Sequence, residues 1–219
     1  VAVIGEPTWL ALAQSLRGYA LVEVTLTGRA AHSSQPDLGI NAVTHLGRLL
    51  VAVESRGVEI AERGGSLLVT LASGGESPFV LAQSARALVE RRTVPGERSD
   101  AVLAEVEHLL VHLRLQDDTV SSHSRLVVAR DPWQLDDSGP AAALARDLER
   151  ALGDDAASEA FHAPYWMEAP LWQAAGIPAV VCGPAGGGLH AADEWVDLHQ
   201  VHRYTLALIE SVTTWGASA

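Results

Sequence analysis

The sequence predicts an α/β protein in which a ferredoxin-like α+β domain is inserted into a second, incomplete α/β domain. Residues 17–130 contain elements in the order strand, helix, strand, strand, helix, strand, which is the split βαβ pattern of a ferredoxin-like sandwich. A short apolar run precedes this region, and from residue 131 helices and strands alternate. We therefore assign residues 1–16 and 131–219 to the outer domain and residues 17–130 to the inserted domain.

Periodicity predicts the elements of the inserted domain. Residues 19–28 alternate apolar and polar side chains, as a half-buried strand does. Between Leu38 and Val53 apolar side chains recur every three or four residues, which predicts an amphipathic helix packed on a sheet. Residues 97–113 form the second predicted helix, with Ser99 as its N-cap. The other predicted strands are 66–75, 84–92 and 124–130.

The outer domain is expected to contain short strands and helices in alternation. The apolar runs VAVIG at 1–5 and AVVC at 179–182 predict two buried strands, and a third is expected near 158–161. The predicted helices lie near 139–152, 168–175 and 199–215. A parallel sheet needs several strands covered on both faces. These few strands therefore account for only part of such a domain.

Composition excludes several classes of function. The 219 residues include 27 acidic and 15 basic side chains, so the formal charge of −12 is expected to repel nucleic acid and anionic lipid. We find no apolar run of about 18 residues and no signal peptide, and the single Cys182 rules out an internal disulfide framework. These features predict a cytoplasmic protein with small molecules or proteins as partners. The start at Val1, inside an apolar run, indicates an interior start.

Two candidate site residues follow strands of the outer domain. Glu6 follows the strand at 1–5 in the sequence GEPT, and the carboxyl end of a strand in an α/β sheet is where ligands and metals bind. His190 follows the strand at 179–182 in GPAGGGLH, where a neutral imidazole is a candidate metal ligand. Each residue by itself is also consistent with an ordinary loop position.

Two further candidates lie in the inserted domain. His32, in AAHSSQP, is in a turn between a strand and a helix, where side chains are exposed. Arg92, in ERRTVPGE, is at a strand end and can hold a carboxylate bidentately. The alternatives are a solvent-exposed turn histidine and a surface salt bridge. His108 and His112 are four residues apart but lack a third ligand, and we interpret them as a solvated helix face.

Taken together and in order, these segments resemble the family of acetylornithine deacetylases, succinyl-diaminopimelate desuccinylases, aminoacylases and glutamate carboxypeptidases. The resemblance covers essentially the whole chain, and the order and spacing of the segments are more specific than any one of them. The matching segments are GEPT at 5–8, GRAAHSSQPDLGINAV at 28–43, ERRTVPGE at 90–97 and AGIPAVVCGPAGGGLHAADEWVDL at 175–198. The resemblance implies that the outer domain is a partial zinc-peptidase α/β sandwich and that the inserted domain is a lid and dimerisation domain.

The resemblance also implies a role for each candidate residue. Glu6 matches a carboxylate ligand of one zinc ion, and His190 matches the imidazole ligand of the other. His32 matches a lid histidine that in family members reaches into the active site of the partner subunit and stabilises the developing oxyanion. Arg92 matches a lid arginine that can bind a substrate carboxylate. The implied protein is a homodimer that hydrolyses N-acyl amino acids or small peptides with two zinc or cobalt ions.

Other parts of the family's metal site are not in this sequence. The family places a His-x-Asp ligand, a bridging aspartate and a Glu-Glu pair before GEPT, whereas this chain contains neither His-x-Asp nor Glu-Glu. We therefore expect no zinc at family geometry in this chain by itself, and an inactive fragment of a hydrolase. The principal alternative is a naturally metal-free module for dimerisation or small-molecule binding, and a third possibility is a site completed by another polypeptide.

Overall fold

The structure is a computed structural model that describes residues 1–153 and 160–217. The chain divides into two compact units, which we call unit 1 (Val1–Arg17 with Pro132–Ala219) and unit 2 (Gly18–Asp131). The predicted mixed α/β fold class is confirmed. In the described parts of the chain, no helix is both long and apolar enough to cross a membrane.

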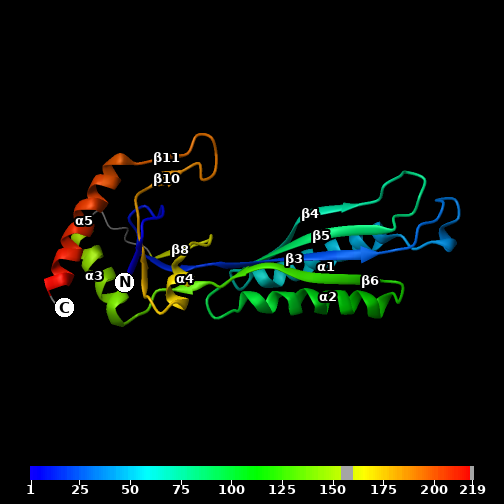
Figure 1. Cartoon of the computed structure of the whole chain (residues 1–219), viewed down its shortest axis with the longest axis horizontal. Helices are drawn as coiled ribbons and strands as arrows, with labels where there is room; N and C mark the ends of the chain where they lie inside the picture. Colours follow the sequence, from blue (N-terminus) through cyan, green and yellow to red (C-terminus); the bar gives the residue numbers. More distant parts are fainter. Residues whose placement is uncertain (154–159, 218–219) are drawn as a thin grey trace. The chain divides into compact units, whose positions relative to one another are not determined.

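Unit 2 is a ferredoxin-like sandwich with one antiparallel sheet of four strands and two helices (Figure 1). The strands lie in the order β4-β5-β3-β6, so the strands on either side of each helix in sequence are not neighbours in the sheet. The elements are β3 (Gly18–Thr27), α1 (Ala42–Ala61), β4 (Ser66–Gly74), β5 (Ser84–Thr93), α2 (Val102–Gln116) and β6 (Ser121–Arg130).

The core of unit 2 lies between the sheet and its helices. Side chains alternate along β3, which places Val22, Val24 and Leu26 on the covered face, where they are fully buried. They belong to the same cluster as Leu49 of α1 and Leu110 of α2. The other face of β3 carries half-buried side chains, so the sheet is covered on one side only within unit 2.

The first helix of unit 2 begins later than the sequence predicts. Residues Pro36–Leu38 form a short 3-10 turn, η1, and α1 starts at Ala42. The N-cap is Asn41, whose Oδ1 accepts a hydrogen bond from the backbone N–H of Val43 at 3.1 Å. The helix then runs eight residues past the predicted end, to Ala61.

Ser99 is not the N-cap of the second helix, so that prediction was wrong. The residue lies in a separate 3-10 turn, η2 (Ser99–Ala101), and α2 begins at Val102 without a side-chain cap. Ser99 is fully buried, and its hydroxyl donates to the carbonyl of Arg130 at 2.7 Å and lies 2.8 Å from Oγ1 of Thr93. The serine therefore links the turn to the ends of β5 and β6 instead of capping the helix.

Unit 1 contains short strands and helices. In chain order these elements are β1 (Ala2–Ile4), β2 (Ala13–Leu16), β7 (Trp133–Gln134), α3 (Gly139–Leu152), β8 (Phe161–Ala163), α4 (Ala169–Ala174), β9 (Ala179–Val181), β10 (Gly186–Gly187), β11 (Trp195–Val196) and α5 (Leu198–Ala217). β1 pairs in parallel with β9. β2 pairs antiparallel with β7 and parallel with β8. The two short strands β10 and β11 form an antiparallel hairpin.

The helices of unit 1 agree with the predicted ranges to within two residues, and α3 agrees at both ends. The expected strand near 158–161 falls partly outside the described residues, and β8 begins at Phe161. Cys182 is completely buried at the end of β9, and burial raises the pKa of its thiol to about 12. The thiol is therefore a core group and not a reactive thiolate.

Candidate functional site

Glu6 is held at the carboxyl end of β1, next to the end of β9. Because the two strands are parallel, their following loops meet at one edge of the sheet. The approach is so close that a Cβ on Gly183 would overlap the carbonyl oxygens of Gly5 and Glu6. Thr8 joins the loops further, since its Oγ1 donates to the carbonyl of Ala11 at 2.7 Å and accepts from the N–H of Gly183 at 2.9 Å. Glu6 itself is exposed.

His190 lies in the hairpin loop between β10 and β11. Its backbone is left-handed, with a φ of 63°, and its side chain is exposed. The base of the hairpin is tight, because a Cβ on Gly187 would lie 2.6 Å from Nε1 of Trp195. A Cβ on Gly186 would lie 3.4 Å from Cγ of Pro7, so the hairpin base borders the loop that carries Glu6.

Tyr165 is a neighbour of Glu6 that sequence reasoning missed. Its hydroxyl donates to the carbonyl of Pro7 at 2.8 Å. Burial, together with the negative charge of Glu6, raises the pKa of this phenol above its ordinary value. The segment APYW around it has no recognisable motif. Its hydrogen bond to Pro7 joins residues that are far apart in the sequence, so no local signal could have found it.

The residues of unit 1 do not fit a complete metal centre. In the described part of the chain, no group of three or more His, Cys, Asp or Glu side chains is arranged to hold a metal ion. Glu6 and His190 could supply one protein ligand each, whereas structural zinc sites use four protein ligands and catalytic sites about three. No catalytic step through a metal ion can be derived from these residues.

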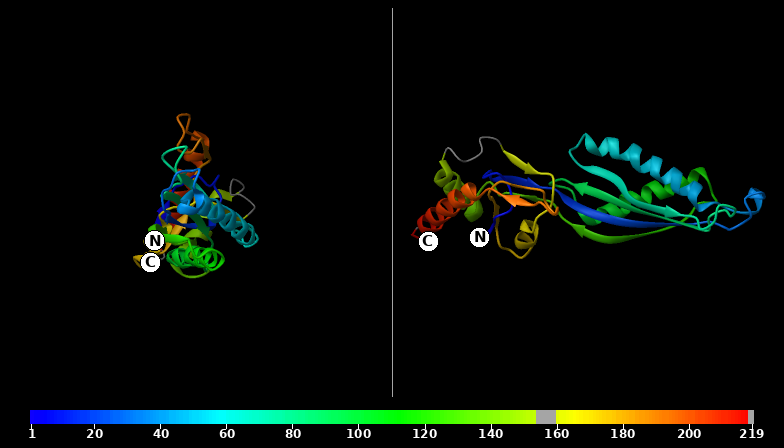
Figure 2. Two further views of the ribbon diagram at one scale, coloured as in Figure 1. Left: turned by 90° about the vertical axis from the view of Figure 1, so that its right-hand side faces the viewer. Right: turned by 90° about the horizontal axis from the view of Figure 1, so that it is seen from above.

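His32 lies in the loop after β3, at the end of unit 2 where the β4–β5 loop also lies (Figures 1 and 2). The two loops pair: His32 forms a β-bridge with Val80, and the N–H of Ser33 donates to the carbonyl of Phe79 at 2.9 Å. The imidazole is exposed, and its Nδ1 lies 2.8 Å from Oγ of Ser34. The ring is therefore presented to solvent from a loop that is fixed by backbone bonds.

Arg92 lies on the uncovered face of the sheet in β5. Its Nε donates to Oε1 of Glu90 at 2.6 Å, and its guanidinium lies over the ring of Tyr19, 5.3 Å from the ring centre. Because Glu90 engages Nε, the two terminal nitrogens remain as a fork for a carboxylate. The salt bridge that we considered as the alternative interpretation of Arg92 is thus present, and it orients the guanidinium.

His32 and Arg92 lie at opposite ends of the same sheet. Arg92 pairs with Tyr19 near the start of β3, whereas His32 follows Thr27 at the end of that strand. The eight residue-to-residue steps from Tyr19 to Thr27 span roughly 26 Å at about 3.3 Å per step. The two side chains of one unit 2 therefore cannot contact the same small molecule.

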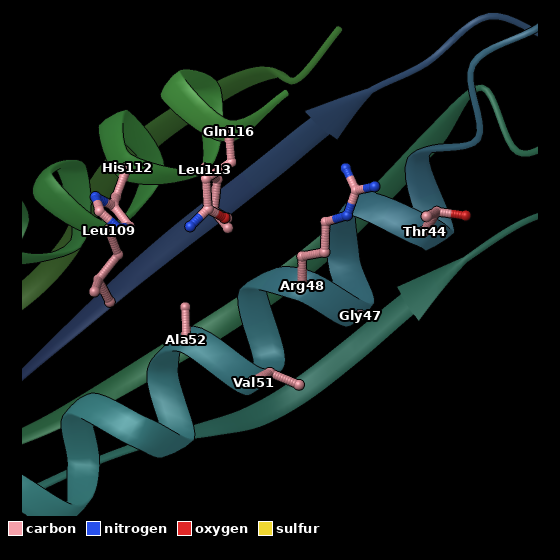
Figure 3. A pocket seen from close by; sticks show the side chains of 9 residues that line it. All are labelled: Thr44, Gly47, Arg48, Val51, Ala52, Leu109, His112, Leu113 and Gln116. Carbon is pink, nitrogen blue, oxygen red and sulfur yellow. The ribbon is translucent and has the colours of Figure 1, made fainter. Parts of the chain in front are cut away.

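A groove of about 590 Å³ runs between α1 and α2 (Figure 3). Its walls are largely apolar, and Gly47 leaves open space where a side chain would stand. Arg48 at its rim pairs with Asp117. None of the four predicted site residues lines this groove, and it lacks converging groups suited to hydrolysis.

Both units of the chain are similar to known proteins. The sequence profile of the peptidase dimerisation domain matches residues 14–118, which include unit 2 from β3 to the end of α2 but not β6. Acetylornithine deacetylase from Myxococcus xanthus is 25% identical over 96% of this chain, and the match covers 56% of that protein. A putative succinyl-diaminopimelate desuccinylase from Mycobacterium tuberculosis is 27% identical over 92% of this chain. Over both units, the chain is similar to acetylornithine deacetylases and succinyl-diaminopimelate desuccinylases.

Solved structures share the fold of this chain. Aminopeptidase PepT from Bacillus cereus superposes with a TM-score of 0.73 over 93% of this chain and 54% of its own, at 16% identity. That likeness establishes the fold, because the identity is too low to carry more. These two curated relatives match almost the whole of this chain, but the chain spans little more than half of their length.

Proposed function

We propose that this chain is part of a metal-dependent hydrolase of amide bonds in N-acyl amino acids or small peptides. The observation that carries the proposal is the similarity to an acetylornithine deacetylase over 96% of the chain, across both units. The relatives are named as deacetylases, desuccinylases and carboxypeptidases, all of which cleave an amide bond next to an amino acid.

Each predicted site residue has a place in this proposal. Glu6 and His190 would each bind one of two zinc ions, with Glu6 supported by its position at the carboxyl ends of two parallel strands. Arg92 would bind the carboxylate of the substrate, supported by the fork that Glu90 and Tyr19 orient. His32 would stabilise the developing oxyanion, supported by its exposure on a fixed loop.

The proposed active protein is a homodimer in which a second copy supplies His32. The separation of roughly 26 Å along β3 means that His32 and Arg92 serve one substrate only if they come from different copies. The description of the matching profile as a dimerisation domain supports this arrangement.

An open strand edge in unit 2 supports the same proposal. β4 ends the sheet, and its sequence SLLVTLASG contains no charge or proline that would discourage pairing with another strand. The flank of α1 next to β4 is apolar and exposed: a Cβ on Gly74 of β4 would lie 2.9 Å from Val43 of this helix. We call this region the edge surface, and it consists of β4 with Val43, Leu50 and Val58.

Unit 1 supports the view that the chain by itself is inactive. Its parallel pair β1–β9 has two strands, although parallel sheets are normally larger and covered on both faces. An exposed apolar stripe follows one side of α5, as expected for a helix that packs against further polypeptide. The stripe consists of Leu198, Leu206, Ile209 and Val212.

The test compares this chain with the product of the complete open reading frame. Hydrolysis of N-acetyl and N-succinyl amino acids is measured for both, together with the zinc content after dialysis. We expect turnover and about two zinc ions per chain in the longer product, and neither in the 219-residue chain. A reading frame that begins at this chain and yields an inactive, metal-free dimer would instead support the alternative of a binding module.

A further inference from the structure

We propose that Ser34 is a positioning residue that holds His32 as the neutral tautomer with its proton on Nε2. Nε2–H is then the hydrogen-bond donor that His32 presents to a ligand. That the ligand is a developing oxyanion rests on the function proposed above, whereas the tautomer follows from the geometry of the loop.

The backbone of Ser34 decides the tautomer. Its N–H donates to Nδ1 of His32, with 3.2 Å between the two nitrogens. A backbone amide nitrogen can only donate, so Nδ1 must offer its lone pair. In a neutral imidazole one nitrogen accepts and the other carries the proton, which places the proton on Nε2.

The hydroxyl of the same residue adds a second donor. Oγ of Ser34 lies 2.8 Å from Nδ1, and the proton of a hydroxyl can rotate to suit its partner. Because Nδ1 already accepts from the backbone, the hydroxyl donates to it as well. Two donors from one residue therefore converge on the same ring nitrogen.

The loop keeps this geometry because it is anchored on both sides of His32. The N–H of Gln35 donates to the carbonyl of His32 at 2.8 Å, and the N–H of Leu81 donates to the carbonyl of Ala31 at 2.9 Å. Ser33 bonds to Phe79 in the neighbouring loop, as described above. A 180° flip of the imidazole ring would break both hydrogen bonds to Nδ1, while the backbone hydrogen bonds would still hold the loop in place.

Nε2 is consequently the ring atom available to an outside partner. The paired loop contributes Phe79 and Val80, whose side chains are 67% and 44% exposed. A donor beside an apolar surface becomes stronger when a second molecule covers it, because the local dielectric constant falls. A neutral N–H donor fixed in advance is suited to stabilise negative charge as it develops.

The test reads the tautomer directly in the 219-residue chain. Histidine is labelled with ¹⁵N, and long-range ¹H–¹⁵N correlations are recorded at about pH 8, above the usual imidazole pKa of about 6.5. The His32→Gln variant identifies the signals of His32. We expect an unprotonated Nδ1 and a protonated Nε2.

The variants isolate the contribution of the Ser34 hydroxyl. Ser34→Ala removes one of two donors and is expected to shift the tautomer ratio roughly fivefold toward the Nδ1–H form, the effect of one net hydrogen bond. Ser34→Thr keeps a hydroxyl and should retain the original spectrum. Ser33→Ala is the matched control on the neighbouring residue and should leave the signals of His32 in place.

Two results would overturn the inference. A proton on Nδ1 of His32 in the unmodified chain contradicts the tautomer, and an unchanged ratio in Ser34→Ala contradicts the role of the hydroxyl. In an active longer product, Ser34→Ala should lower kcat and leave KM nearly unchanged. If the tautomer is found but no form of the protein hydrolyses an acyl amino acid, the proposed function fails and the positioning by Ser34 stands.

Discussion

At the scale of single residues, the glycines show where the backbone tolerates no side chain. Gly183 lies between the loops after β1 and β9, where a Cβ would overlap two carbonyl oxygens. Gly47, on the exposed side of α1, would place a Cβ in open space. In the sequence both positions are simply glycine. Only the fold shows that a side chain would be unfavourable at Gly183, next to the paired strands, and tolerated at Gly47.

Gly183→Ala is expected to lower the free energy of unfolding of unit 1 by about 1–3 kcal/mol, the usual cost of overpacking. Gly47→Ala is the matched control and should stabilise unit 2 by about 0.5–1 kcal/mol, because alanine favours a helix interior. All six tryptophans lie outside unit 2, so urea unfolding followed by tryptophan fluorescence reports on unit 1 and far-UV circular dichroism on both. A Gly183→Ala variant as stable as the original would contradict the close contact at Gly5 and Glu6.

His45 is a buried histidine that makes the stability of unit 2 depend on pH. Burial lowers its pKa, an effect opposed by the charge of Asp117 and assisted by that of Arg48. Its Nε2 lies 3.5 Å from Oγ1 of Thr119. Below the usual pKa of about 6.5, the unfolded chain therefore binds a proton that the folded chain does not bind.

The contribution of His45 is complete above about pH 6.5 and is lost as the pH falls toward the lower pKa of the folded state. We expect the free energy of unfolding of the original chain to fall more between about pH 7 and pH 5 than that of His45→Gln. His123→Gln, at an exposed position of β6, is the control and should follow the original chain. The measurement is urea unfolding followed by circular dichroism at several pH values in this range. If the free energy of unfolding depends on pH in the same way for His45→Gln and the original chain, the expectation is refuted.

At the scale of elements, β4 and α1 share a boundary that explains the proposed dimer. β4 is long and uncharged, and its last five residues are exposed. Edge strands in monomeric proteins are usually protected by charges, prolines or bulges. β4 has a register shift between Val69 and Leu71 but carries neither a charge nor a proline. Pairing with a second copy would satisfy the free backbone groups of β4 and cover the apolar flank of α1 at the same time.

Val58→Asp places a charge in the edge surface and is expected to shift the chain from dimer to monomer, because an unpaired buried charge costs several kcal/mol. Val58 is 64% exposed in the single chain, so the fold itself should tolerate the change. Val111→Asp, at an exposed position of α2, is the matched control and should remain dimeric. Sedimentation velocity at equal concentrations measures the difference, and equal behaviour of the two variants would exclude the edge surface.

At the scale of the whole molecule, the chain is built from two compact units that differ in how their segments are connected. Unit 2 begins and ends on neighbouring strands, since Tyr19 of β3 pairs with Arg130 of β6. Its buried core contains residues from β3, β4, β5 and both helices, and the partly buried Leu126 and Ala129 of β6 pack against it. Unit 1 draws on two separated segments of the chain and leaves apolar surface of α5 exposed.

Residues 18–131 expressed alone are therefore expected to fold. Unfolding should be cooperative, with a free energy of about 5–15 kcal/mol and no contribution from tryptophan fluorescence. The two-dimensional ¹H–¹⁵N spectrum should be well dispersed. Broad, poorly dispersed signals would show that unit 2 depends on unit 1 for its stability.

The sequence by itself determined the order and type of the main elements, because long runs with a clear period, such as those of β3 and α3, bury one face in any compact fold. It also marked Glu6, His32, Arg92 and His190 through motifs whose spacing is local. The roles of these residues stay proposals. Boundaries were less certain, as the displaced start of α1 and the buried Ser99 show, since tertiary contacts decide where a turn ends.

Only the tertiary structure decided which residues lie together. It placed Tyr165 against the Glu6 loop, oriented Arg92 through Glu90, and set His32 and Arg92 at opposite ends of one sheet. These relations depend on strand register and on pairing between distant segments. Periodicity describes which face of an element is buried but not which neighbour covers it, and for that reason the separation that favours a two-copy site could be found only in the folded chain.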